Sequence, residues 1–381
     1  MYWIKLKSCI KNFIMFAFAC LLLFPLALVN GQSLDLPTSR YGISFGNSSY
    51  FTGLRINWRD SHVEKITGIN LSIWSAKDNE EADMTGLNFG LFMPEGGNLT
   101  GLNLGGVGVA ANQNLTGINI GVVGAGAGGN VTGLTIGGLG AGAGGNMSGI
   151  QFGLFGIGSG GNMSGLNLGG VGLGSGGDLS GIQLAGLGLG SGGDLVGLSL
   201  AGIGLGSGRD AKGITIGLLG AGAGEDALGI TIGGLGAGAG NNMLGLQFGL
   251  FGIGAGENLT GINIAGIGAG AGEHLKGITI VGGGAGSKNV TGLTIAGIGA
   301  GGVNLKGIFL STIINKVVDD GQITGIAISG FNQIKGTQKG ISLGVVNYAY
   351  ELHGFQIGLI NYVRDNPKYL RILPLINWHF D

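Results

Sequence analysis

The chain has 381 residues, of which 90 are glycine and only 10% are charged, and its formal net charge at pH 7 is -1. A charge this close to zero gives no electrostatic footprint for nucleic acid or for an anionic membrane surface. The only cysteines, Cys9 and Cys20, lie near the N-terminus. The rest of the chain therefore has no disulfide, no thiolate metal site and no cysteine nucleophile.

Residues 1–31 have the features of a secretory signal peptide. Lys5, Lys7 and Lys11 form a basic start, an apolar run follows over residues 13–29, and residues 29–31 offer a cleavage site. The alternative is an uncleaved anchor, because the apolar run is just long enough to span a bilayer. We expect an exported protein, located at the cell surface, in the outer membrane or outside the cell.

Residues 98–303 repeat one line of about 16 residues. We number the positions of each line 1 to 16, with Asn114 at position 1 of its line. Position 4 is glycine in every line, and these glycines are 16 residues apart up to Gly277 and 15 apart after it. A fixed period of this kind indicates a repeat architecture.

Apolar and polar residues alternate within each line, which is typical of β-strands. Positions 5 and 7 are apolar, as in Ile118 and Ile120, and position 6 between them is a small polar residue or an amide. Positions 10, 12 and 14 are apolar or small, and positions 11 and 13 are almost always glycine. We predict two short strands, at positions 3–7 and 10–14, joined by a turn at positions 8 and 9. Positions 5, 7, 10, 12 and 14 are expected to point into the core.

Two all-β architectures fit this pattern. In a β-solenoid, each line is one coil of about 16 residues, and equivalent residues stack from coil to coil. In the alternative, each line is a short β-hairpin, and the hairpins form a closed or barrel-like meander. The solenoid is favoured, because a ring of so many short strands would enclose a wide apolar hole with nothing to fill it.

On the solenoid reading, position 6 forms a ladder of small polar side chains on the exposed face, and positions 11 and 13 form a flat glycine face. This polar ladder is the candidate binding site. Its members are Asn103, Asn119, Thr135, Gln151, Asn167, Gln183, Ser199, Thr215, Thr231, Gln247, Asn263, Thr279 and Thr294. Such surfaces suggest lateral association with another copy, or binding to a surface glycan or protein.

The flanking segments keep the first strand of the repeat but vary the rest. Residues 32–97 have longer connectors and more large aromatic and charged residues, and residues 304–381 have less glycine. Terminal repeats have one unstacked face, so both segments are expected to act as caps. The predicted organisation is a signal peptide (1–31), N-terminal irregular repeats and cap (32–97), regular repeats (98–303), and C-terminal divergent repeats and cap (304–381).

Two C-terminal lines, Gly340–Asn347 and Gly354–Asn361, share one motif. It reads glycine, an apolar residue, any residue, an apolar residue, glycine, two apolar residues, asparagine. This motif resembles the glycine-rich surface repeat proteins of Gram-negative bacteria, and the resemblance extends over most of residues 53–361. It implies an exported protein with no enzymatic role. The central lines depart from the motif, because they have glycine in place of its asparagine.

A second, looser resemblance concerns the C-terminus. Trp378-His379-Phe380 is similar to the aromatic ends of outer-membrane β-barrels, although Asp381 follows. This resemblance implies, as the alternative function, an outer-membrane barrel with a channel or transport role.

The sequence contains no pattern typical of a catalytic or metal site. No pair of the four histidines has metal-ligand spacing, and the polar residues of the repeats are mostly Asn, Thr, Gln and Ser. These groups catalyse only with an acid or base partner, and no line supplies one. We predict a non-enzymatic, exported surface repeat protein with a structural or adhesive role and no cofactor.

Overall fold

The structure, a computed structural model, describes residues 33–380, and the predicted signal peptide lies outside them. All regular elements in the described range are β-strands. Within that range there is no helical segment with the length and apolarity needed to span a bilayer. The chain falls into two compact units, unit 1 up to Leu173 and unit 2 from Gly174 onward.

The strands of unit 1 are β1 (Ser33–Pro37), β2 (Tyr41–Gly46), β3 (Tyr50–Asn57), β4 (Lys65–Ser72), β5 (Asp83–Gly90), β6 (Glu95–Gly105), β7 (Gly108–Gly121), β8 (Gly124–Ala127), β9 (Val131–Gly137), β10 (Gly140–Ala143), β11 (Met147–Gly153), β12 (Gly156–Ser159) and β13 (Met163–Gly169). The boundary between the units falls within β14 (Gly172–Ser175).

The strands of unit 2 are β15 (Leu179–Ala185), β16 (Gly188–Ser191), β17 (Leu195–Ala201), β18 (Gly204–Ser207), β19 (Ala211–Gly217), β20 (Gly220–Ala223), β21 (Ala227–Gly233), β22 (Gly236–Ala239), β23 (Asn242–Gly249), β24 (Gly252–Ala255), β25 (Asn258–Ala265), β26 (Gly268–Ala271), β27 (His274–Val281), β28 (Gly284–Gly286), β29 (Asn289–Ala296), β30 (Gly299–Ser311), β31 (Ile314–Val363) and β32 (Ile372–His379).

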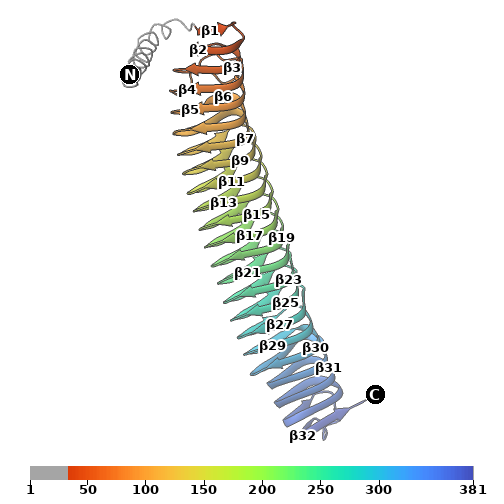
Figure 1. Ribbon diagram of the computed structural model, residues 1–381. Coiled ribbons are helices and arrows are strands. Elements are labelled where there is room, and N and C mark those ends of the chain that lie inside the picture. Colours follow the sequence, from red (N-terminus) through yellow and green to blue (C-terminus); the bar gives the residue numbers. More distant parts are fainter. Residues whose placement is uncertain (1–32, 381) are drawn as a thin grey trace, which may run out of the picture. The chain divides into compact units, whose positions relative to one another are not determined.

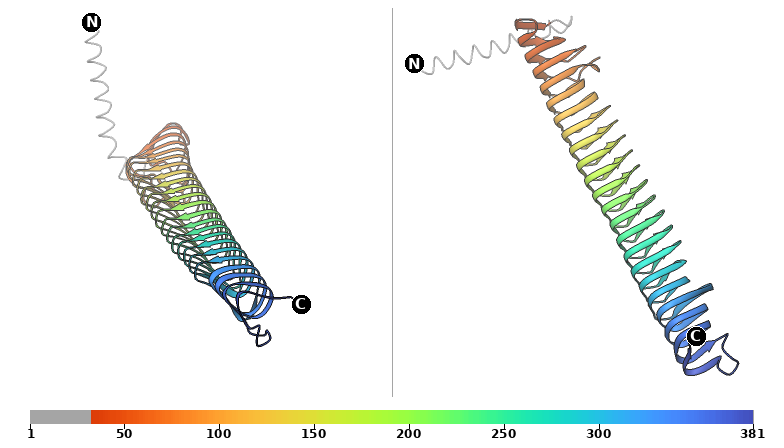
Figure 2. Two further views of the ribbon diagram at one scale, coloured as in Figure 1. Left: turned by 90° about the horizontal axis from the view of Figure 1, so that it is seen from below. Right: turned by 90° about the vertical axis from the view of Figure 1, so that its right-hand side faces the viewer.

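Each unit is a β-solenoid in which one line of the repeat makes one coil (Figure 1; Figure 2). In a regular coil a long strand covers positions 2–8, as in β9, and a short strand covers positions 11–14, as in β10. Both pair in parallel with their equivalents one coil away, so that Val131 is opposite Met147 and Gly140 is opposite Gly156. The predicted solenoid is confirmed. The hairpin meander is wrong, because it would pair successive strands antiparallel.

The parallel pairing gives way to an antiparallel strand at one end of each unit. In unit 1, β1 runs antiparallel to β2. In unit 2, β32 runs antiparallel to the last part of β31, with Phe355 opposite Trp378. An uncovered strand edge is a template for the addition of further strands. β1 and β32 each pair with the strand edge at one end of the stacked coils.

The interior of the coil is filled from positions 2, 6, 8, 12 and 14. In one coil of unit 1, Leu115, Asn119 and Ala125 are buried, whereas Ile118 is 44% exposed and Val123 is 45% exposed. The prediction is therefore right for positions 12 and 14 and wrong for positions 5, 7 and 10. The turn lies at positions 9 and 10 instead of 8 and 9, and both of its side chains point outward. Even-numbered positions thus point inward in both strands.

Glycine at position 4 is required by the stacking of the coils. Gly133 has a φ of +110°, and a Cβ placed on it would lie 2.1 Å from the carbonyl oxygen of Gly117 in the preceding coil. A side chain is disfavoured at this φ and has no space at this distance. The glycine that marks the period in the sequence is therefore the residue that lets one coil approach the next.

The last coils of unit 2 carry an amide ladder of their own. The Nδ2 atoms of Asn315, Asn332 and Asn347 donate to the Oδ1 atoms of Asn332, Asn347 and Asn361, at 3.0, 2.8 and 2.8 Å. All of these side chains are buried. The asparagine of the C-terminal motif is thus an interior residue that links one coil to the next.

Candidate functional site

The side chains predicted to form an exposed binding ladder do form a ladder, but it runs through the interior. Each of them is at most 2% exposed. They are Asn103, Asn119, Thr135, Gln151, Asn167, Gln183, Ser199, Thr215, Thr231, Gln247, Asn263, Thr279 and Thr294. The predicted exposure is wrong, and the ladder presents no side chain to a ligand at the surface.

Hydrogen bonds between coils explain why polar side chains can occupy the interior. In unit 1, Asn103 Nδ2 donates to Asn119 Oδ1 at 2.7 Å, and Asn119 Nδ2 donates to Thr135 Oγ1 at 3.2 Å. In unit 2, Ser199 Oγ donates to Gln183 Oε1 at 3.0 Å. Equivalent residues stack at the strand spacing, so the polar groups of these pairs bond to one another inside the coil.

Because the polar side chains are inside and the apolar ones outside, replacing a polar residue of the ladder should cost more stability than replacing the apolar residue next to it. Asn119→Ala removes both bonds and leaves the donor of Asn103 without its Asn119 acceptor, so we expect a loss of about 1–3 kcal/mol in the free energy of unfolding. Ile118→Ala, at the neighbouring outward position, should cost less than about 1 kcal/mol. Urea unfolding of the two variants tests this order. A larger loss for Ile118→Ala would contradict the interior assignment.

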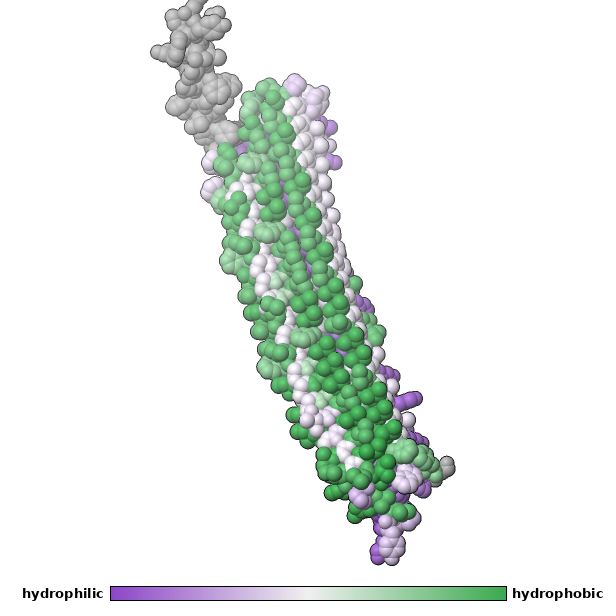
Figure 3. Space-filling view, turned by 60° about the horizontal axis from the view of Figure 1, so that its bottom comes forward, coloured by the Kyte–Doolittle hydropathy of each residue, from purple (hydrophilic) through white to green (hydrophobic). Residues whose placement is uncertain are grey.

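The outward side of the long strands forms an apolar face in each unit, made by positions 5 and 7. In unit 1 it comprises Leu102, Leu104, Ile118, Ile120, Leu134, Ile136, Ile150, Phe152, Leu166 and Leu168. In unit 2 it comprises Ile182, Leu184, Leu198, Leu200, Ile214, Ile216, Ile230, Ile232, Leu246, Phe248, Ile262, Ile264, Ile278, Ile280, Leu293 and Ile295. None of these side chains is fully buried. Hydrophobic residues form bands along the stacked coils in Figure 3.

The outward side of the short strands is a glycine strip, made by positions 11 and 13. In unit 2 it comprises Gly188, Gly190, Gly204, Gly206, Gly220, Gly222, Gly236, Gly238, Gly252, Gly254, Gly268, Gly270, Gly284 and Gly286. Next to it runs an apolar ridge at position 10, made by Leu187, Ile203, Leu219, Leu235, Phe251 and Ile267, all of them exposed. The predicted flat glycine face is therefore present.

Between Asp178 and Asp226 of unit 2, the charged side chains gather at the corner formed by positions 16, 1 and 3. Arg209 contacts Asp178 through Nη2 at 2.8 Å and Asp194 through Nε at 2.9 Å, and Lys212 Nζ lies 2.8 Å from Asp210 Oδ2. These cations offset the repulsion between aspartates stacked coil upon coil. From Gly101 to Ser311, positions 4–14 contain no charged residue. The apolar face and the glycine strip are therefore free of charge.

The same contacts lower the pKa values of the stacked carboxyl groups. The backbone N–H of Asp194 donates to Asp178 Oδ1 at 2.9 Å, and this bond, together with Arg209, holds the pKa of Asp178 below its ordinary value. The hydrogen bond from Lys212 has the same effect on the pKa of Asp210. Both carboxylates are therefore charged at neutral pH, and this corner is the hydrated edge of the coil.

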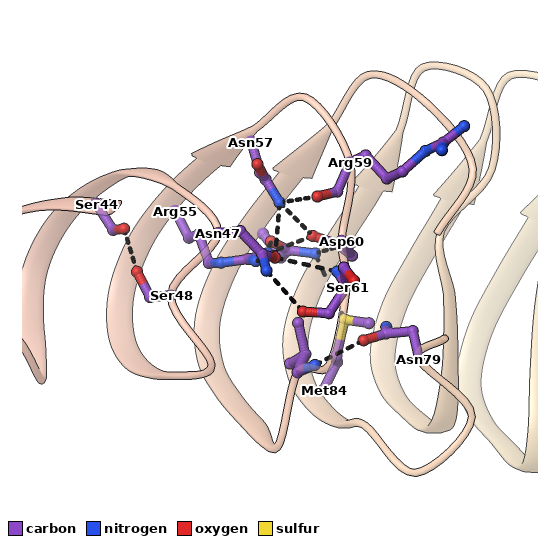
Figure 4. A network of polar contacts seen from close by, with 12 residues as sticks. Ser44, Asn47, Ser48, Arg55, Asn57, Arg59, Asp60, Ser61, Asn79 and Met84 are labelled. Carbon is purple, nitrogen blue, oxygen red and sulfur yellow. Dashed lines mark hydrogen bonds and ion pairs between the residues drawn. The ribbon is translucent and has the colours of Figure 1, made fainter. Parts of the chain in front are cut away.

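A buried polar network lies in the first coils of unit 1 and was not foreseen from the sequence (Figure 4). Arg55 occupies position 6 of its coil and forms an ion pair with Asp60, and both side chains are at most 1% exposed. Arg55 also donates to Asn70 Oδ1 at 2.8 Å and to Asn47 Oδ1 at 2.7 Å. Asn70 Nδ2 donates to Asp60 Oδ2 at 3.0 Å. The charges are thus held by protein groups inside the coil.

Metal-ligating side chains form no candidate metal centre in the part of the chain that the structure describes. No group of three or more His, Cys, Asp or Glu residues within it is placed to hold a metal ion. Comparisons with protein-family models, curated proteins and solved structures find no match for this chain. The candidate functional regions are the apolar face and the glycine strip, because both lie on the exposed side of the strands.

Proposed function

We propose that the chain is a non-enzymatic, exported surface repeat protein with an adhesive role, and that the apolar face makes the adhesive contact. The observation that supports this proposal is that the long strand turns its aliphatic side chains outward and its amide side chains inward. Aliphatic side chains such as Ile150 and Ile182 are left in water, while amides such as Gln151 and Gln183 are buried. Extended apolar patches on a protein surface are typical of interaction sites.

The composition of the apolar face points to an apolar partner. It carries no charge, so ion pairing and electrostatic steering contribute little to binding. Its side chains stand on strands that are hydrogen-bonded on both sides by neighbouring coils, as β19 is by β17 and β21. Little conformational entropy is therefore lost when the face is covered. A hydrophobic surface, or an apolar patch on another surface protein, fits these properties.

Adsorption of the full chain to alkyl-coated and hydroxyl-coated sensor surfaces tests this proposal. We expect preferential binding to the alkyl surface. The double variant Ile182→Lys and Ile214→Lys places charges on the apolar face and should weaken that binding about tenfold, which corresponds to ~1.4 kcal/mol. Because both side chains already point outward, circular dichroism should show an intact fold.

The matched control carries two lysines away from the apolar face. Asn112→Lys and Asn241→Lys replace exposed residues at positions 15 and 16 and should leave adsorption unchanged. Equal binding to both surfaces, or equal loss in the two double variants, would refute an adhesive role for the apolar face.

The channel role has no specific support here. It requires a water-filled lumen, whereas the interior of the coils is occupied by buried side chains such as Leu179, Leu189 and Leu195.

A further inference from the structure

The glycines of the repeat are of two kinds, and only one kind is required by the coil itself. Gly229, at position 4, has a φ of +117°, and a Cβ there would lie 2.2 Å from the Gly213 carbonyl oxygen. Gly188, Gly190 and Gly204, in the glycine strip, have no positive φ, and a Cβ on any of them would meet nothing within 4 Å. The fold therefore has room for side chains along the strip.

The next coil of the same unit shows that side chains are compatible with these positions. Ile314 pairs with Gly299, and Lys316 pairs with Gly301, in the same parallel register. Glycine also destabilises a strand relative to alanine, because it loses more conformational freedom on folding. The packing of the coil therefore does not explain why these positions are glycine. Glycine in a strand often marks a site where another backbone or a ligand approaches closely.

The apolar ridge beside the strip indicates which partner the strip contacts. Leu187, Ile203 and Leu219 project from position 10 and are each close to half exposed. A ridge next to a flat strip is self-complementary under a two-fold axis, because each ridge can lie on the strip of the other molecule. We propose that the glycine strip and apolar ridge of unit 2 form a dimer interface with the same region of a second copy of this chain.

The area of this region is sufficient for such an interface. Positions 9–13 make a band about 16 Å wide at ~3.3 Å per residue. The short strands of unit 2 are β16, β18, β20, β22, β24, β26, β28 and the start of β30. Eight strands about 4.8 Å apart extend over roughly 38 Å. The band therefore offers about 600 Å² per molecule, or about 1,200 Å² in total, which is the lower limit for specific interfaces.

The absence of charge favours a second copy over a charged partner. Positions 9–13 contain no charged residue in any regular coil, so two copies meet without desolvating an ion. In the two-fold arrangement the whole region of each molecule is covered by one partner, so association stops at the dimer. The adhesive proposal concerns the long strands, and the dimer does not depend on it.

Sedimentation equilibrium of the full chain at micromolar concentration tests the proposal, and a dimer is expected. The double variant Gly190→Lys and Gly204→Lys should raise the dissociation constant at least about tenfold, because two buried ammonium groups would lack partners. The control Val196→Lys places one lysine on an exposed position of the long strand β17 and should leave the dimer intact.

A second double variant separates the interface from the fold. At a protein concentration low enough to keep the chain monomeric, Gly190→Ala and Gly204→Ala should raise the thermal midpoint of unfolding, because alanine restricts the unfolded chain and meets no obstacle in the coil. The same change should weaken the dimer, because it thickens the strip. Opposite effects on fold and association are expected only if the strip is a contact surface.

Several outcomes would overturn the dimer. The first is that the wild-type chain is a monomer, and the second is that both glycine variants leave the dimer unchanged. The third is that the double variant Ile182→Lys and Ile214→Lys loses the dimer while the glycine variants retain it. The last result would assign self-association to the apolar face. Failure of the adsorption experiment with an intact, strip-dependent dimer would remove the adhesive function alone.

Discussion

Gly229→Val is expected to destabilise unit 2 by about 3 kcal/mol or more, one of the two largest effects of a single substitution that the structure predicts. Valine is branched at Cβ and would have to adopt a φ of +117°, with its Cβ 2.2 Å from the Gly213 carbonyl oxygen. Relief requires the coil to move away from its neighbour. Movement of that size breaks the parallel pairing of β19 with β21, in which Gly213 is opposite Gly229.

Gly204→Val is the matched control for this substitution. It introduces the same side chain in the same unit, but at a glycine with no positive φ and no atom within 4 Å of the new Cβ. At a protein concentration low enough to keep the chain monomeric, its effect on the unfolding midpoint in urea should be small. Because coils in a solenoid contact mainly their neighbours, Gly229→Val should also make the transition broader or split it. Equal midpoints for the two variants would show that position 4 is not a steric requirement.

Asp60→Ala is expected to destabilise the first coils of unit 1 by about 3–5 kcal/mol, because it leaves the buried guanidinium of Arg55 without its counter-charge. The double substitution Arg55→Met and Asp60→Leu should recover most of this loss, since it removes both charges and retains side-chain volume. Protease cleavage before Leu99, followed against time, reports this local opening, and urea unfolding gives its free energy.

An exposed ion pair provides the comparison. Lys288 Nζ lies 2.5 Å from Glu273 Oε1, but both side chains are about half exposed or more. Glu273→Ala should therefore cost less than about 1 kcal/mol. If Asp60→Ala were equally mild, or if the double variant were less stable than Asp60→Ala, the network in Figure 4 would not hold the first coils together.

The surfaces were harder to predict than the coil. The glycine strip follows from the sequence, because positions 11 and 13 have no side chain whichever way they point. The apolar face does not, because Ile118 and Ile120 were expected in the core on account of their hydrophobicity. The rule that buried residues are hydrophobic does not imply that hydrophobic residues are buried. The pairing of Arg55 with Asp60 was also not predicted, because their contact depends on how the connector after β3 folds back.

The sequence by itself determined the period and the presence of two strands in each line, and it favoured the solenoid over the hairpin meander. Glycine returns at position 4 at a fixed interval, and stacked coils are the arrangement in which that glycine meets its own copy, as Gly133 meets Gly117. The tertiary structure decided which side of each strand is the interior. Alternation places Ile118 and Asn119 on opposite sides but does not say which side is enclosed. That choice depends on where the chain turns and on the hydrogen bond that Asn119 receives from Asn103, one coil away.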